Sequence, residues 1–141
     1  MARFRVVTHA LPVVAVLLLL GLLYLIPAVR TAVQQIDSSI EATCREYGGE
    51  TEEACLQALL RILQSEEESF ERKNQAVWVI GQLADPRALP HLGKLLTGEP
   101  CADPCRKDEA ICQREVDKAI RWCKGEAWLM KSFRRLAGSQ W

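Results

Sequence analysis

Six cysteines have the most distinctive chemistry in this sequence: Cys44, Cys55, Cys101, Cys105, Cys112 and Cys123. Cysteines form disulfides, bind metals or carry redox chemistry, and their number and spacing help to separate these uses. The segment CADPC (101–105) is C-x3-C, whereas zinc knuckles and thioredoxin-like enzymes use C-x2-C. An even number of cysteines in a small exported domain is typical of a disulfide framework. We therefore predict structural disulfides, with a cysteine-based redox or metal-binding protein of the periplasm as the alternative.

Helix geometry limits which cysteines can pair. Cys44 lies four residues before Gly48, and Cys55 lies four residues after Thr51. In a helical hairpin these two cysteines would face each other near the turn. We expect a Cys44–Cys55 disulfide, which would stabilise the fold by about 2–4 kcal/mol.

The other four cysteines leave two arrangements open. Cys112 and Cys123 are eleven residues apart on one predicted helix. That separation is about 16 Å, and a disulfide needs Cα atoms within about 7 Å. Each of them therefore needs a different partner. Cys105–Cys112 with Cys101–Cys123 satisfies this condition, and so does Cys101–Cys112 with Cys105–Cys123.

Nothing else in the sequence predicts a reaction centre. The chain has two histidines, His9 and His91. Nucleophilic catalysis needs a base positioned beside a nucleophile, and no spacing brings His91 next to one. We predict no enzymatic activity, no cofactor and no metal site.

An uncharged segment precedes all the cysteines. Residues 10–29 read ALPVVAVLLLLGLLYLIPAV. Twenty helical residues span about 30 Å, the thickness of the hydrocarbon core of a bilayer, and backbone inside lipid must satisfy its own hydrogen bonds. We predict a retained transmembrane helix in contact with the lipid bilayer, with Pro12 and Pro27 near its ends. A cleaved signal sequence is the alternative, although its apolar core is usually about 7–15 residues long.

The charges that flank this segment predict its orientation. Arg3 and Arg5 precede it, and Arg30 follows it; basic residues beside a membrane span favour the cytoplasm. All six cysteines follow the span, which agrees, because disulfides persist in oxidising compartments. We expect a single-pass protein of an inner (plasma) membrane. Residues 1–29 would be the cytoplasmic tip and anchor, and residues 30–141 an extracytoplasmic, periplasmic domain.

Helical periodicity dominates the rest of the chain. Apolar residues at 33, 36 and 40 lead to YGGET (47–51), where paired glycines favour a helix end. Further helices are expected from about 51, over 70–83, from 85 to 98, over 108–124 and over 126–137, with a loop over 97–109. Either Ser65 or Ser69 caps the helix over 70–83. The residues expected to face inward include Leu56, Leu59, Leu63, Phe70, Val77, Ile80, Leu83, Leu89, Leu92, Leu95, Leu96, Val116, Ala119 and Ile120.

Two segments follow one plan. NQAVWVIGQLADPRALPHLGKLL (74–96) predicts a helix, a short turn and a second helix, with Asp85 as N-cap and Pro86 as first helical residue. KAIRWCKGEAWLMKSFRRLA (118–137) has the same order about 40 residues later, a period typical of helical solenoids. Each hairpin has an apolar side that it buries by stacking on its neighbours.

The first of these hairpins resembles a HEAT-type repeat of the short kind also found in phycobilisome bilin lyases. The resemblance is carried by Ile80-Gly81-Gln82-Leu83 and by Asp85-Pro86-Arg87-Ala88-Leu89, and it is weaker over 118–137, where CKGEA replaces the Asp-Pro-Arg turn. It implies an α-solenoid whose usual role is protein binding, without catalytic residues. The expected fold is all-α: a transmembrane helix followed by a short HEAT-like solenoid of helical hairpins.

Charge is distributed unevenly, although 18 basic and 18 acidic residues cancel overall and indicate no nucleic-acid partner. Ten acids and two bases lie between 37 and 71, and six bases and one acid lie between 118 and 135. Solvated helix faces are the simpler interpretation. Aromatic residues beside bases are also common in binding hot spots. The candidate interface residues are Trp78, Arg121, Trp122, Lys131, Arg134, Arg135 and Trp141.

These patterns together favour a protein that binds rather than reacts. We predict a non-enzymatic interaction module whose partner is another protein. It would be an accessory subunit, or an assembly or scaffold factor, of a membrane complex on the extracytoplasmic side.

Overall fold

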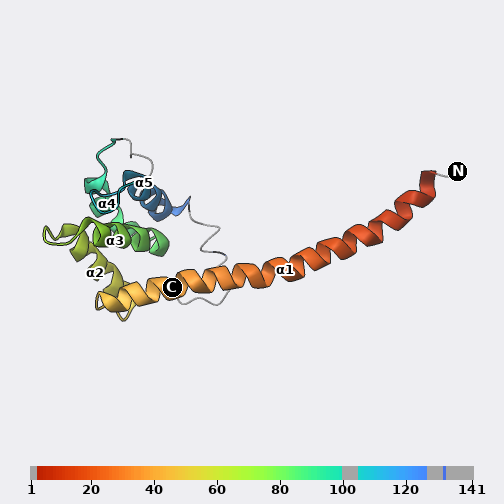
Figure 1. The fold of residues 1–141 in the computed structure, drawn as a ribbon, viewed down its shortest axis with the longest axis horizontal. Coiled ribbons are helices and arrows are strands. Elements are labelled where there is room, and N and C mark those ends of the chain that lie inside the picture. The colour runs from red at the N-terminus through yellow and green to blue at the C-terminus, as the bar shows by residue number, and fades with distance from the viewer. Residues whose placement is uncertain (1–2, 100–104, 127–131, 133–141) are drawn as a thin grey trace.

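A computed structural model describes residues 3–99, 105–126 and 132, and every regular element in these ranges is helical (Figure 1). The predicted all-α fold is confirmed. The predicted helix over 126–137 falls almost entirely outside the described residues. The elements are α1 (Arg3–Glu46), α2 (Glu52–Gln64), α3 (Phe70–Leu83), the 3-10 turn η1 (Pro86–Ala88), α4 (Leu89–Leu95), α5 (Gln113–Arg121) and the π-helical turn η2 (Trp122–Glu126).

The long helix α1 contains both the apolar segment at 10–29 and the apolar residues at 33, 36 and 40. Its 44 residues run from the apolar segment into the folded domain without a break, a length of about 66 Å. Pro12 and Pro27 therefore lie inside the helix rather than near its ends. Beyond Pro27, α1 enters the folded domain, where Ile40 is part of the buried core. The hydroxyl of Thr31 donates to the Pro27 carbonyl oxygen at 2.9 Å.

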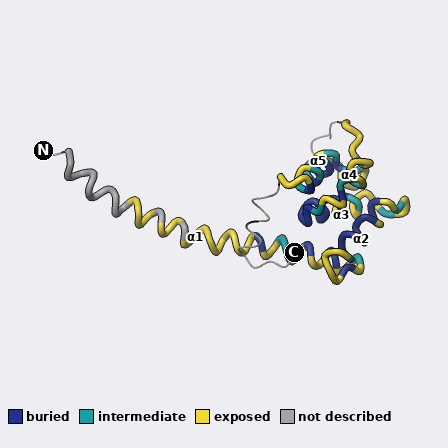
Figure 2. Tube along the Cα trace, turned by 180° about the vertical axis from the view of Figure 1, so that it is seen from behind, coloured by how far each residue is buried: buried dark blue, intermediate teal, exposed yellow. Residues whose placement is uncertain are grey.

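The apolar half of α1 is exposed. Within Val14–Glu46, the most apolar 18-residue window has a mean hydropathy of 2.2 and no buried residue. Leu17, Leu23 and Tyr24 are 63%, 68% and 77% exposed. Figure 2 shows most of the residues of α1 from Val14 to Ala32 in yellow, the colour of exposed residues, on the part of the helix that leads away from the buried core. The helix is long and apolar enough to cross a membrane.

A tight turn joins α1 to α2. Gly48 has a φ of +83°, which favours glycine. A Cβ on Gly49 would lie 2.4 Å from the Cα of Cys55, so only glycine fits this approach. The structure joins Cys44 and Cys55 across the turn as a disulfide with a Cα–Cα distance of 5.0 Å. The end of α1 is therefore covalently tied to the start of α2.

Side-chain caps fix where the helices begin. The hydroxyl of Thr51 accepts from the N–H of Ala54 at 3.2 Å, and that of Ser69 accepts from the N–H of Arg72 at 3.3 Å. Ser69 is therefore the cap of α3 rather than Ser65. Asp85 accepts from the N–H of Arg87 at 2.8 Å at the start of η1, as the sequence predicts. These caps satisfy backbone donors that a helix leaves open in its first turn.

The core lies on both sides of α3. Leu56, Leu59, Val77, Ile80 and Val116 have no exposed surface. α2 packs on one side of α3 and α5 on the other, while α4 covers α5. A Cβ on Gly81 would lie 3.2 Å from both Cα and Cβ of Ala119, so glycine lets α3 and α5 approach closely.

Three predictions are wrong: that Phe70 faces inward, that Leu96 faces inward, and that the helix before Cys123 begins at residue 108. Phe70 and Leu96 are each 43% exposed instead of facing inward. Leu96 is turned out because α4 ends at Leu95, before Gly98. α5 begins at Gln113 rather than 108, because a disulfide between Cys105 and Cys112 closes the preceding residues into a loop. The Cα atoms of that pair are 5.9 Å apart.

Candidate interaction surface

A groove beside Trp78 lies where α1, α3 and the loop before α5 meet. Its volume is about 520 Å³, and Trp78 on α3 is half-buried in its wall. α1 contributes Ser39, α3 contributes four residues, and the loop contributes two. The lining residues are Ser39, Glu71, Asn74, Gln75, Trp78, Lys107 and Asp108. We call this the Trp78 groove.

One buried side chain holds the loop wall of the groove. Asn74 is 4% exposed, and its amide nitrogen donates to the carbonyl oxygens of Lys107 and Ala110, each at 2.8 Å. Its amide oxygen accepts from the N–H of Cys112 at 2.8 Å. Asn74 and the Cys105–Cys112 disulfide therefore fix the same loop. Asn74 was not predicted from the sequence, although a polar residue on the buried face of α3 was a usable signal.

The Trp78 groove contains charged side chains that do not pair with one another. Glu71, Lys107 and Asp108 are exposed, and within the described ranges their side chains form no ion pair. Gln75 instead donates to the hydroxyl of Thr43 at 3.3 Å and links α3 to α1. The groove thus offers an aromatic ring, two carboxylates and one ammonium group to a binding partner. Such a set suits a polar or basic side chain that stacks on an aromatic ring.

A second groove lies on the other side of the same loop. Its volume is about 530 Å³, and apolar groups of Phe70, Leu95 and Ile111 line it together with the Cys105–Cys112 disulfide. Charged residues form its rim: Lys94, Glu99, Arg106 and Glu109. Arg106 pairs with Glu109 at 2.9 Å. The exposure of Phe70 is therefore explained by its place in an open groove.

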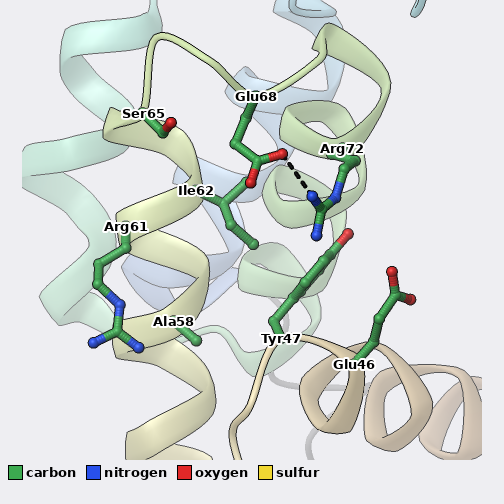
Figure 3. A pocket seen from close by; sticks show the side chains of 8 residues that line it. All are labelled: Glu46, Tyr47, Ala58, Arg61, Ile62, Ser65, Glu68 and Arg72. Atoms are coloured by element: carbon green, nitrogen blue, oxygen red, sulfur yellow. Dashed lines mark hydrogen bonds and ion pairs between the residues drawn. The ribbon is translucent and has the colours of Figure 1, made fainter.

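A third, open pocket lies between the end of α1, α2 and the start of α3 (Figure 3). Its volume is about 340 Å³. The Arg72 guanidinium carbon lies 5.0 Å from the centre of the Tyr47 ring, and a guanidinium nitrogen lies 2.8 Å from Glu68. A hydrogen bond with Tyr47 raises the pKa of Arg72 above its ordinary value. Arg72 thereby joins the end of α1 to α3.

The structure brings only some of the predicted interface residues together. Trp78 and Trp122 line one narrow crevice with Gly81, and the Lys118 ammonium lies 4.7 Å from the centre of the Trp122 ring. Arg121 pairs with Asp117 at 3.1 Å and is about half exposed. The other four predicted interface residues lie outside the described part of the chain: Lys131, Arg134, Arg135 and Trp141.

The remaining residues with possible chemistry lie apart from the Trp78 groove. Cys123 is buried, with Sγ 3.9 Å from the carbonyl oxygen of Ile80, and Cys101 lies outside the described residues. His91 is half-buried, with Nδ1 2.9 Å from the amide nitrogen of Gln64. Where the structure describes the chain, no three His, Cys, Asp or Glu residues gather as a metal site would require.

The fold defines the class of protein as a helical-hairpin domain carried on one long, exposed apolar helix. Residues 73–98 match the family model described as PBS lyase HEAT-like repeat. The match covers α3, the Asp85–Arg87 turn and α4, so this hairpin is a HEAT-type repeat, as the sequence predicts. No curated protein and no solved structure matches the chain.

Proposed function

We propose that this chain is a single-pass membrane protein whose helical-repeat domain binds another protein. Its role would be that of an accessory subunit or an assembly factor of a membrane complex, without catalysis. HEAT-like repeats are typically binding modules, and residues 73–98 form one. The exposed apolar half of α1 supplies the surface that lipid would cover.

The observation that carries this proposal is the composition of the Trp78 groove. The anchor helix itself forms part of the groove through Ser39, because α1 continues without a break from the apolar segment into the domain. A partner in the groove would therefore contact both the repeat and the base of the anchor. Such a position suits a subunit of the same membrane.

The extracytoplasmic location rests on charge and on cysteines. Arg3 and Arg5 favour a cytoplasmic N-terminus. The Cys44–Cys55 and Cys105–Cys112 pairs both belong to the part of the chain after the apolar segment. Disulfides persist on the oxidising side of a membrane. A reporter fused after Trp141 tests this location: extracytoplasmic activity supports it, and cytosolic activity overturns it.

Site-specific crosslinking tests the binding surface. In this experiment Trp78 is replaced by a photo-crosslinking amino acid in the full chain, and crosslinking is triggered in native membranes. Gln57, which is exposed on α2 outside the Trp78 groove, is the matched control position. We expect Trp78 to give a discrete crosslinked band that contains another membrane protein, and Gln57 to give none. Equal labelling from both positions, or none from Trp78, would contradict a binding role for the groove.

A further inference from the structure

The folded domain turns back along α1. Arg72 contacts Tyr47, Gln75 contacts Thr43, and Trp78 shares the groove with Ser39. Residue numbers rise along α3 as they fall along α1, so the two helices run in opposite directions. The C-terminal end of α3 therefore points toward the apolar half of α1, as Figure 1 illustrates.

α5 follows the direction of α3. Cys112 contacts Asn74, Ala119 approaches Gly81, and Cys123 lies at Ile80. Residue numbers rise together from the Cys112–Asn74 contact to the Ala119–Gly81 contact, so α3 and α5 run in the same direction, and Cys123 in η2 stays at the level of Ile80 and Gly81. The turn η2 at the end of α5 consequently points toward the apolar half of α1. In both Figure 1 and Figure 2, η2 is the described part of the domain that extends furthest in that direction.

The rise per residue of a helix gives the distance, measured along α1, between η2 and the end of the apolar segment at Val29. Gln75 lies level with Thr43, and Ile80 is five residues further along α3, so Ile80 and Cys123 lie near the level of residue 38. From there to Val29 is nine residues, or about 14 Å. Lipid headgroups extend about 5–8 Å beyond the hydrocarbon core. The distance that remains between Cys123 and the headgroup layer can be spanned by the last residues of η2 together with an extended lysine or arginine side chain.

The residues at this end have the composition of a membrane interface. Lys124 is exposed, Arg121 is about half exposed, and Trp122 carries the Lys118 ammonium over its ring. Glu126 is the single acid in η2. Bases and tryptophans are the residues that favour anionic lipid surfaces and the headgroup layer.

We propose that the η2 end, formed by Arg121, Trp122 and Lys124, contacts anionic phospholipid headgroups of the bilayer that α1 crosses. This inference rests on the proposed membrane anchor. The contact fixes the domain against the membrane at a second point, so that α1 cannot swing freely and the Trp78 groove keeps one orientation to the bilayer. Anionic lipid strengthens the contact, and added salt weakens it.

Hydrogen exchange of the full chain in lipid nanodiscs tests this contact. Discs of phosphatidylcholine alone are compared with discs that contain 30% phosphatidylglycerol, at equal salt. We expect amides of 121–126 to exchange at least threefold more slowly in the anionic discs. Lys124→Glu removes that difference. Lys107→Glu makes the same charge change near the N-terminal end of α3 and leaves the difference intact.

The outcomes separate this inference from the proposed anchor. Failure of the chain to co-purify with discs of either kind would contradict the membrane anchor itself. Insertion with equal exchange of 121–126 in both lipids would overturn the headgroup contact and leave the anchor standing. Inorganic phosphate is added to the phosphatidylcholine discs in a third arm. Protection by free phosphate there would overturn a lipid contact in favour of a simple anion site.

Discussion

The side-chain oxygen of Asn74 accepts a hydrogen bond from the backbone N–H of Cys112 at 2.8 Å, across 38 residues of sequence. The same amide donates to two carbonyl oxygens of the loop that the Cys105–Cys112 disulfide closes. A covalent bond and a buried amide therefore hold the loop that separates the two largest grooves. The shape of the candidate surface therefore depends on both the disulfide and the Asn74 side chain.

Asn74→Ala leaves buried backbone groups of this loop without partners. Unpaired buried polar groups are costly, so we expect the free energy of unfolding to fall by about 2–4 kcal/mol. Urea unfolding of the full chain in detergent, followed by tryptophan fluorescence, measures the change. Gln75→Ala is the control, because the Gln75 side chain is exposed and loses a single long hydrogen bond, to the hydroxyl of Thr43 at 3.3 Å. A loss no larger than that of the control would show that the loop does not depend on Asn74.

Gly81→Ala tests the close approach of α3 and α5. The added Cβ would lie 3.2 Å from Ala119, which forces the two helices apart. We expect destabilisation of about 1–3 kcal/mol, as is usual for overpacking. Gly93 in α4 has nothing within 4 Å of an added Cβ. Gly93→Ala should therefore stabilise by about 0.5–1 kcal/mol, because alanine favours helix. The same sign for both variants in thermal or urea unfolding would contradict the packing described for α3 and α5.

Removing the Cys44–Cys55 disulfide should destabilise the domain without changing its fold. The bridge closes a short loop of separation 11, for which chain entropy gives about 2–3 kcal/mol. The double variant Cys44→Ala, Cys55→Ala is compared with the oxidised parent by urea unfolding. We expect a lower midpoint with an unchanged helical circular-dichroism spectrum. An unchanged midpoint would mean that this bridge does not stabilise the native protein.

Glu53 gives the stability a pH dependence. Arg87 donates to the Glu53 carboxylate and also pairs with Asp85 at 2.6 Å, so it links the start of α2 to the η1 turn. The hydrogen bond from Arg87, and a smaller one from Gln57, lower the pKa of Glu53 below its ordinary value of 4.5. A lowered pKa in the folded state adds stability above the unfolded pKa and loses it as pH falls through the folded pKa.

Glu53→Gln should therefore reduce the unfolding midpoint at pH 7 and have progressively less effect as the pH falls below the ordinary glutamate range. Because both groups are exposed, we expect a small effect that added salt reduces. Glu52→Gln removes a charge from the same helical turn without touching the Arg87 pair. Identical midpoints for the two variants at every pH would contradict a specific contribution from the Arg87 contact.

The sequence predicts best what depends on neighbours along the chain. Thr51 and Asp85 cap helices as expected, and α3 spans its predicted residues, because a cap and an apolar stripe are local patterns. The prediction that Phe70 faces the core was wrong. Helical spacing places Phe70 on the apolar side of α3, but it does not reveal the open groove between α3 and the disulfide loop. The predicted start of α5 was wrong for a similar reason. The loop over 107–112 is held by the side-chain amide of Asn74, which lies 33–38 residues earlier in the sequence.

By itself, the sequence determined an all-α chain with one uncharged segment long enough to cross a membrane, and a HEAT-type hairpin at 74–96, which the family model matches over 73–98. These properties follow from composition and from periods of three or four residues. Only the tertiary structure decided that α3 and α5 run back along α1 and that Asn74 binds the loop before α5. Those relationships depend on contacts between residues that are distant in sequence. Helical periodicity and capping residues are local patterns, so they do not predict which distant side chains come into contact.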